Sequence, residues 1–390
     1  MQHLLTWFRA KLQQSVSASE DTNARTAQLV RLISEVGPDV PEISRRLGQF
    51  NESVRYRYKE KLLNKGFAIQ AAIAYEKLGF KRVMFVCDFQ SEYRLYANAI
   101  LSAMNEMCYV VYFAKSIPDG FYLVDAAIPG EFIKPFARFV SDLKSKGLFA
   151  FVDIMTFEWV RNPPMRSEFY DFNVGRWDFD WVNMSPFPKD NVSGMPQPKE
   201  EFDMVDLLIL KELQIDATKS LKEMATRLRI NYKKLVWHYS KHVLDRQLVR
   251  SYRLNWMGTR YDYELEKALH RKHRYLSLVL IVKNTTDYER MELMSKLDPL
   301  PFLWFEAAGK NYYANFAFPI DQVTEALVYL ESCLQSVRDR TEYYVLDSAN
   351  ALTFTFAYQL YDQEKKRWIF NPRELLLRFD NLLMRIKEQR

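Results

Sequence analysis

An internal repeat constrains the fold of this 390-residue chain more than any other feature. The segment VPEISRRLGQFNESVRYRYKEKLLNKGF (residues 40–67) aligns with LKEMATRLRINYKKLVWHYSKHVLDRQLV (residues 221–249). Apolar and aromatic positions coincide in the two copies, with Val54 on Leu235 and Tyr56 on Trp237. Because self-similarity over a long period indicates a duplicated structural unit, we expect two modules that are built alike.

Each copy has the pattern of a winged helix-turn-helix. An apolar-periodic helix precedes it, at residues 26–36 in the first copy and at 204–215 in the second, where Asp203 is a suitable N-cap. A short helix, a turn and a longer helix follow, and then a strand-like exit, FAIQAAIAY or LVRSYRLNW. We expect a β-hairpin wing to close the three helices.

The sequence after each copy repeats as well. Residues 83–160 and 275–347 both give the order β-α-β-β-α-β, with Val, Phe and Tyr in the strands and apolar residues three or four apart in the helices. This order is the split βαβ arrangement of ferredoxin-like domains. The predicted fold class is therefore α+β, with two tandem modules that each join a winged helix-turn-helix to a ferredoxin-like βαββαβ domain.

These patterns predict seven segments along the chain. They are an N-terminal helix (1–22), the first winged helix-turn-helix (23–76), the first ferredoxin-like domain (77–160), a Pro- and aromatic-rich linker or hairpin (161–203), the second winged helix-turn-helix (204–258), the second ferredoxin-like domain (259–370) and a C-terminal helix (371–390).

An aromatic stretch recurs after each ferredoxin-like unit. FYDFNVGRWDFDW (169–181) has an echo in YDQEKKRWIFN (361–371). The recurrence suggests an added β-hairpin or a swapped edge strand, and a surface loop pinned by its aromatic residues is the alternative. The C-terminal helix is amphipathic and could pack on the N-terminal helix or on a partner.

Composition excludes several classes of function. Neither G-x-x-x-x-G-K-[ST] nor G-x-G-x-x-G occurs, so the usual nucleotide-binding loops are missing, and no cofactor is expected. No run of about 18 apolar residues is present, so we expect no membrane partner. Three scattered cysteines (Cys87, Cys108 and Cys333) indicate buried thiols in a reducing cytoplasm rather than disulfides or a zinc site.

The positive charge is concentrated in the two repeated segments. The whole chain has a net charge of +6, whereas residues 51–66 carry +3 and residues 219–250 carry +7, which leaves the remainder at −4. Such local concentration is typical of contact with a polyanion. On helices at ~100° per residue, Val54, Tyr58 and Leu62 form a core stripe in the first copy. Leu235, Tyr239 and Val243 do so in the second copy, and cations with a large aromatic lie opposite.

The repeated segments resemble the DNA-binding domain of Lrp/AsnC-type transcription regulators. DLLILKELQIDATKSLKEMATRLRI followed by a basic helix carries the resemblance, and VRYRYKEKLLNKGF is similar to the recognition helix and wing entry of archaeal members. The family joins this domain to a ferredoxin-like effector-sensing domain, an order that occurs here twice. The resemblance implies a cytoplasmic, nucleoid-associated regulator of transcription that is not an enzyme.

Double-stranded DNA is the implied partner. Two helices, residues 51–64 and 231–245, would enter grooves, with wing contacts from Lys65, Arg250 and Arg253. The expected DNA-binding residues are Asn51, Ser53, Arg55, Tyr56, Arg57, Lys59, Lys65, Lys233, Lys234, Trp237, His238, Lys241, Arg250 and Arg253. The sequence leaves open a homodimer, a small-molecule effector and a protein of the transcription machinery as further partners.

Two other functions stay open. The chain could be a protein-interaction scaffold of the transcription machinery, since an exposed Trp237 also suits a protein contact. It could also be an enzyme, because Lrp-like folds resemble those of siroheme decarboxylases, which act on a tetrapyrrole held against the sensing domains. That activity would require His and Arg facing a cavity, and no histidine is convincingly placed in a sensing-domain strand.

Two smaller features of the sequence concern a metal site and a ligand cavity. His238 and His242 have a spacing that metal ligands use, but no nearby carboxylate or cysteine completes a set, so no metal is expected. Phe302, Trp304 and Phe305 are expected to pack a sheet, although Trp304 could line a ligand cavity.

Overall fold

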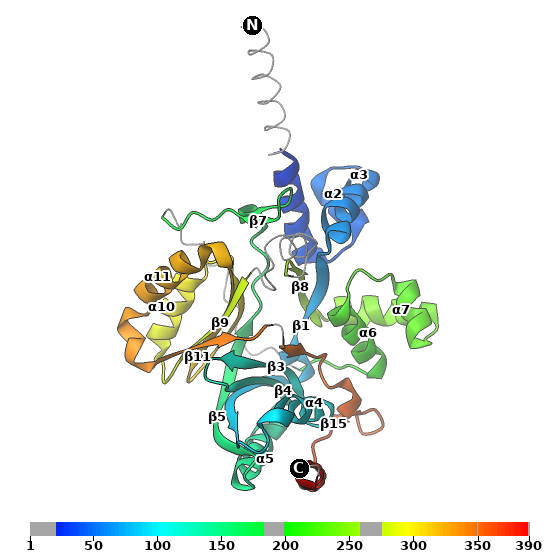
Figure 1. Cartoon of the computed structure of the whole chain (residues 1–390). Coiled ribbons are helices and arrows are strands. Elements are labelled where there is room, and N and C mark those ends of the chain that lie inside the picture. Colours follow the sequence, from blue (N-terminus) through cyan, green and yellow to red (C-terminus); the bar gives the residue numbers. More distant parts are fainter. Residues whose placement is uncertain (1–20, 183–198, 258–274, 349, 389–390) are drawn as a thin grey trace, which may run out of the picture.

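The computed structural model describes residues 21–182, 199–257, 275–348 and 350–388 (Figure 1). The first helical unit begins with a helix over residues 21–36. It continues with α2 (Val40–Leu47), α3 (Asn51–Arg57), a π-helical turn (Tyr58–Leu62) and a 3-10 turn (Leu63–Lys65).

The second helical unit repeats the first. It comprises α6 (Met204–Ile215), α7 (Leu221–Leu228), α8 (Tyr232–His238) and a π-helical turn (Tyr239–Leu244). The predicted core stripes are confirmed, because Val54, Leu62, Leu235 and Val243 are fully buried and their aligned tyrosines are half-buried.

The strand-like exits pair with each other rather than folding back as separate hairpin wings. β1 (Ala68–Ile73) runs antiparallel to β8 (Val249–Asn255), with Ala71 opposite Tyr252. The hairpin expected for each wing is therefore wrong in the described residues. A local pattern predicts a strand but not its partner, because pairing depends on how the two modules meet.

Each ferredoxin-like unit has the predicted β-α-β-β-α-β order, which confirms the α+β class. The first contains β2 (Phe80–Phe89), α4 (Ala97–Cys108), β3 (Val110–Ile117), β4 (Tyr122–Pro129), α5 (Ile133–Ser145) and β5 (Phe149–Arg161). The second contains β9 (Tyr275–Val282), α10 (Asp287–Leu297), β10 (Leu303–Gly309), β11 (Tyr312–Pro319), α11 (Val323–Leu334) and β12 (Thr341–Leu346).

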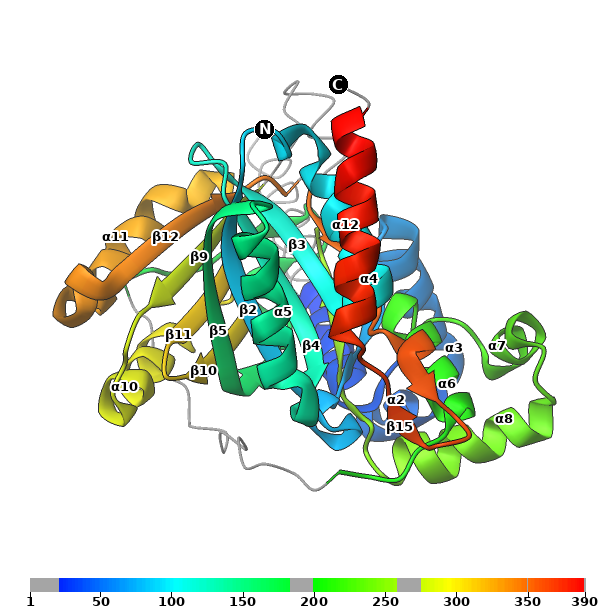
Figure 2. The ribbon, with the colours of Figure 1, turned by 90° about the horizontal axis from the view of Figure 1, so that it is seen from below.

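The two units share one sheet that closes on itself. Its strand order is β12-β9-β11-β10-β5-β2-β4-β3, and β12 also pairs with β3, so eight strands form a barrel (Figure 2). The β10–β5 and β12–β3 pairs join the two modules. A short strand, β13 (Leu352–Thr353), adds to β3. Helices α4, α5, α10 and α11 lie outside the barrel (Figures 1 and 2).

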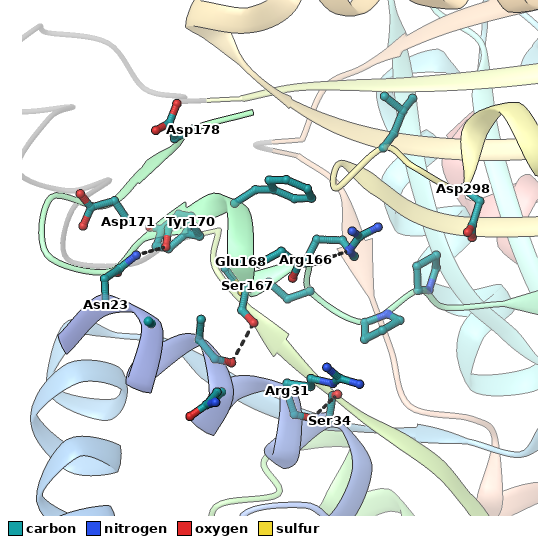
Figure 3. Close-up of a pocket in the computed structure, with 18 of the residues that line it drawn as sticks. Asn23, Arg31, Ser34, Arg166, Ser167, Glu168, Tyr170, Asp171, Asp178 and Asp298 are labelled. Atoms are coloured by element: carbon teal, nitrogen blue, oxygen red, sulfur yellow. Dashed lines mark hydrogen bonds and ion pairs between the residues drawn. The ribbon is translucent and has the colours of Figure 1, made fainter. Parts of the chain in front are cut away.

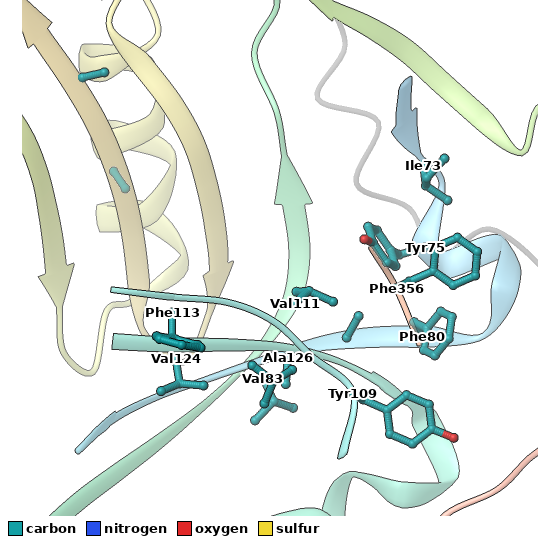
Figure 4. Packing of buried hydrophobic residues seen from close by; sticks show 14 of the residues in the cluster. Ile73, Tyr75, Phe80, Val83, Tyr109, Val111, Phe113, Val124, Ala126 and Phe356 are labelled. Carbon is teal, nitrogen blue, oxygen red and sulfur yellow. The ribbon is translucent and has the colours of Figure 1, made fainter. Parts of the chain in front are cut away.

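Alternation along the strands separates two hydrophobic cores. Phe85 and Cys87 of β2 belong to the large outer core under the helices, whereas Met84 and Val86 belong to the smaller core inside the barrel. Figure 4 shows the outer core where Val83, Val124 and Ala126 of the sheet approach the ring of Phe113. The three cysteines are free and buried, as predicted.

Both recurring aromatic stretches form the predicted β-hairpin. β6 (Tyr170–Asp171) pairs with β7 (Arg176–Trp177), and β14 (Tyr361–Asp362) pairs with β15 (Arg367–Trp368). Trp177 and Trp368 are buried, and the ring of Trp368 lies 4.5 Å from that of Phe80. The loop alternative is thus excluded.

The C-terminal helix α12 (Pro372–Glu388) packs on α5. Phe379 contacts Phe139 with ring centres 5.8 Å apart, and Asp380 pairs with Lys146 at 2.8 Å. Residues 1–20 of the predicted N-terminal helix lie outside the described residues. Among the described residues, no helix has the length and apolar character needed to cross a membrane.

Candidate active site: a cavity at the mouth of the barrel

A cavity of about 590 Å³ lies where the β1–β8 pair covers one end of the barrel. Its walls come from both modules. Strands β2, β3 and β4 of the first unit and β9, β10 and β11 of the second supply residues, and Gln70 to Ile73 of β1 with Arg250, Arg253 and Asn255 of β8 form the cover.

The barrel interior becomes polar toward this cavity. Deeper inside, it is filled by apolar residues such as Met155, Val279 and Ile281. At the cavity the same inward-facing positions hold Arg82, Tyr112, Asp125, Ser277, Tyr313 and Asn315. Polar groups buried in this way are costly unless they are satisfied, so a ring of them around a cavity indicates a binding site.

Arg82 and Asp125 form a buried ion pair across β2 and β4. The guanidinium also lies 5.0 Å from the ring centre of Tyr75 and 5.4 Å from that of Phe305. Arg82 Nε and Asp125 Oδ1 have no hydrogen-bond partner. Burial raises the pKa of Asp125, although the neighbouring guanidinium opposes this shift.

Arg253 is a cavity residue whose guanidinium is incompletely hydrogen-bonded within the described residues. It donates to the carbonyl of Trp304, and its guanidinium carbon lies 3.3 Å from the centre of that indole ring. Its Nε is buried without a partner, and no described carboxylate pairs with it. Burial lowers the pKa of Arg253, with no charged neighbour to offset it. A cation held in this way favours an anionic ligand.

Arg250 lies at the rim of the same cavity. It pairs with Glu76 at 2.7 Å and donates to the carbonyl of Val160 at 2.9 Å. The exit strands pair over the barrel, so Arg250 and Arg253 both line the cavity, and their expected wing contacts with DNA stay a prediction. Trp304 lines this cavity, and whether a ligand occupies it is part of the proposal below.

Tyrosines supply hydroxyl groups to the cavity. Burial raises the pKa values of Tyr112 and Tyr313, so both hydroxyls stay protonated at neutral pH and can donate. The described lining contains no histidine. Among the described lining residues, the tyrosine hydroxyls are groups that can donate a proton.

Sequence reasoning missed Arg82 and Asp125. The available signal was a charged residue inside each of two apolar strands, KRVMFVCDF and FYLVDAAI. Alternation places Arg82 on the face of Met84 and Asp125 on the face of Leu123, which are both inside the barrel.

The faces of α3 and α8 that were expected to contact DNA are exposed to solvent. Asn51, Ser53, Arg55, Tyr56 and Lys59 are exposed in the first copy, and Lys233, Lys234, Trp237 and Lys241 are exposed in the second. Arg57 is half-buried and donates to Gln49 at 3.1 Å, and Lys65 is also partly buried. The structure therefore groups the expected contacts into two separate basic faces.

His238 does not belong to the exposed face. Only 4% of it is exposed, and its Nδ1 lies 2.9 Å from Oδ1 of Asp206. Its expected contact with DNA is contradicted, because the helix turns this side chain toward the N-terminus of α6.

A second, larger cavity of about 1070 Å³ lies between the helix of residues 21–36, the segment around residues 163–173 and α10 (Figure 3). Several of its polar groups have protein partners. Arg161 bonds to Asp298 and Glu306, and Ser167 Oγ donates to the carbonyl of Ala27 at 2.9 Å. This cavity therefore gives less reason to expect a charged ligand.

Comparisons with known proteins bear on the fold. No protein-family model and no curated protein matches the chain. The crystal structure of the siroheme decarboxylase NirDL matches with a TM-score of 0.50 and 12% identity, over 91% of this chain and 99% of that one. An AsnC-family transcriptional regulatory protein from Pyrococcus furiosus matches 34% of this chain and 86% of its own, with 15% identity and a TM-score of 0.27. The leucine response regulatory protein of Mycobacterium tuberculosis covers 38% of this chain and 93% of its own, with 17% identity and a TM-score of 0.25.

The full-length likeness corrects one expectation. The chain was expected not to be an enzyme, and the likeness overturns that exclusion, because an enzyme has a similar fold along 91% of the chain.

Proposed function

We propose that this chain binds a tetrapyrrole that carries carboxylates in the barrel-mouth cavity and decarboxylates one of its side chains. The uncompensated Arg253 in a cavity built from both modules is the observation that carries this proposal. The architecture shared with a siroheme decarboxylase supports it. In this proposal the segments on either side of the predicted boundaries at residues 160, 203 and 258 each contribute residues to the cavity wall.

The cavity suits a flat, anionic ligand. Tyr75, Trp304 and Phe305 offer aromatic surface to a conjugated ring. Arg253 can take a ligand carboxylate in a bidentate hydrogen bond, and Arg250 at the rim can take another by exchange with Glu76. Neutral polar groups such as Asn162, Asn255 and Asn315 supply further hydrogen bonds.

The reaction needs few groups from the protein. The bond between a side-chain carbon and its carboxylate breaks, CO2 leaves, and the electron pair stays with the carbon, where the conjugated ring can delocalise it. A proton then forms the new C–H bond. The Tyr112 hydroxyl faces the cavity as a donor, and Asp125, which is paired with Arg82, is the second group to test in this role.

Mass spectrometry of the tetrapyrrole tests the reaction. We expect siroheme incubated with the protein without oxygen to lose CO2, and Tyr112→Phe or Asp125→Asn to reduce turnover about 10²–10⁴-fold in whichever variant lacks the donor. That variant should still take up the ligand, which separates lost chemistry from lost binding. A ligand that stays bound but unchanged in the wild type would contradict the proposal.

We infer binding of duplex DNA as a second candidate function. The exposed cations and aromatics on α3 and α8 support it, since neither face is covered by its own module. Lysine contacts with phosphates would make the affinity fall steeply as salt rises. Retention of random duplex DNA at low salt, with loss at higher salt, is the expected result, and no retention at low salt would favour the scaffold function instead.

A further inference from the structure

Four potential metal ligands meet where the N-terminus of α6 touches the recognition helix of the second module. Asp203, Asp206, His238 and His242 place one ligand atom each within 4.8 Å of the others. Asp206 is fully buried, His238 nearly so, and Asp203 and His242 are partly exposed. Solvent therefore reaches one side of the cluster, which leaves an entry path for an ion.

The local structure explains why sequence spacing alone did not reveal the cluster. Asp203 and Asp206 form a reciprocal capping box at the start of α6, which fixes both carboxylates. His238 ends α8, and His242 lies in the π-helical turn that follows. Both imidazoles then face Asp206, 32 and 36 residues away along the chain.

Both histidines aim the same ring nitrogen at one carboxylate. His238 Nδ1 lies 2.9 Å from Asp206 Oδ1, and His242 Nδ1 lies 2.9 Å from Asp206 Oδ2. His238 Nδ1 is also 3.7 Å from Asp203 Oδ1. A tetrahedral ion with bonds of ~2.0–2.1 Å needs ligand atoms ~3.3 Å apart. The contacts with Asp206 lie slightly inside that spacing, whereas the wider separations in the cluster, which reach no further than 4.8 Å, must shorten when an ion binds.

We propose that this cluster binds one divalent transition-metal ion, with His238, His242 and Asp206 as ligands and Asp203 as the fourth. Two imidazoles and two carboxylates without a thiolate suit Zn²⁺ and its neighbours Co²⁺ and Ni²⁺. An ion bound through Nδ1 would replace the hydrogen bonds between the two imidazoles and the Asp206 carboxylate.

The ion fastens the recognition helix to α6. His238 and His242 flank Trp237, whose ring centre lies 5.0 Å and 4.6 Å from theirs, and Trp237 is 53% exposed. A bound ion therefore fixes the orientation of this aromatic on the basic face of α8. The site lies apart from the barrel-mouth residues, so it stands independently of the proposed enzyme activity.

Titration of the metal-free full-length chain with Co²⁺ tests the site. We expect one equivalent to bind with the visible absorption of tetrahedral cobalt, to quench tryptophan fluorescence, and to be displaced by Zn²⁺. His242→Ala, a change at a partly exposed position, should abolish these signals. Asp203→Asn should weaken binding at least about tenfold while keeping the helix cap, because asparagine caps as well as aspartate.

The matched control is the double variant His270→Ala/His273→Ala, which removes two histidines outside the described residues and should bind as the wild type does. Circular dichroism confirms that each variant is folded. Binding that survives His242→Ala, or is lost in the control, overturns the proposal, as does a folded wild type that takes up no cobalt.

Discussion

Arg253 lowers the stability of the ligand-free fold, and in the proposed function it favours ligand binding. An uncompensated cation in a partly buried site costs several kcal/mol, and the described residues supply no carboxylate to offset it. Packing on Trp304 and one hydrogen bond to its carbonyl recover only part of that. Such a residue is retained where a ligand completes its environment.

A different charged residue, Glu289, contributes to the response to acid. Glu289 of α10 bonds to Arg340 at 2.6 Å and caps its own helix through Thr286, and these contacts lower its pKa to about 2. A lowered pKa in the folded state means that the stabilisation is present above pH 4.5 and is lost as pH falls toward 2. We expect Glu289→Gln to flatten the dependence of Tm on pH over that window.

Thermal unfolding across this pH range measures the effect. Arg340→Met should flatten the same slope, and the double variant should add little, because both residues act through one pair. A slope unchanged in Glu289→Gln would show that other carboxylates govern the acid response.

The identity of a residue alone does not predict which charged side chains are buried in the folded protein. The sequence predicts the core stripes, because 3.6-residue spacing is local, and it predicts the buried cysteines. It misassigned His238, because burial of a flanking residue depends on which element packs against it. Asp206 became a partner of His238 only when α6 and α8 met.

At the level of elements, local patterns predict each helix and strand of the two modules and both aromatic hairpins. Local patterns do not predict that β1 pairs with β8, because each strand alone is compatible with a hairpin wing in its own module or with pairing to the equivalent strand of the other module. The π-helical turns after α3 and α8 were also unpredicted. Their recurrence at aligned positions indicates that both modules use the same local geometry.

The recognition helices carry a prediction of their own. Changing Lys233 and Lys234 to glutamine should lower duplex DNA affinity and reduce the salt slope by about 1–2, since each lost phosphate contact removes ~0.9. Electrophoretic mobility shifts over a salt series measure this.

The control is Lys365→Gln/Lys366→Gln, which removes two exposed lysines in the turn between β14 and β15. It keeps the net charge equal to that of the test variant. Equal loss of affinity in both variants would indicate a general charge effect rather than a contact by α8.

On the scale of the whole molecule, the barrel exists because two modules complete one sheet. β10 approaches β5 closely at Gly309, where an added Cβ would lie 2.8 Å from the carbonyl oxygen of Thr156. We expect Gly309→Val to destabilise the fold by about 1–3 kcal/mol and to weaken tetrapyrrole binding, because the clash separates the two halves of the cavity wall.

Denaturant unfolding and ligand titration measure both consequences. Gly130→Ala is the control, since a Cβ there meets only the carbonyl oxygen of Gly79 at 3.8 Å. A Gly309→Val protein with unchanged stability would show that the β5–β10 junction does not hold the modules together.

The tandem α+β architecture follows from the repeat in the sequence, but the cavity at the barrel mouth does not. A closed barrel requires the β12–β3 and β10–β5 pairs between modules, and neither pair has a local signal. The cavity residues are therefore spread over ten strands, from Gln70 to Thr355, in no compact motif.

Titration of siroheme into the wild type and Arg253→Met, followed by its visible absorption, tests the central claim most directly. We predict one tetrapyrrole per chain for the wild type and an affinity about 10–100-fold lower for the variant, as loss of a charged hydrogen bond implies. The ligand-free variant should unfold at the same temperature as the wild type or higher. No uptake by the wild type, or equal affinity in both proteins, would contradict the account.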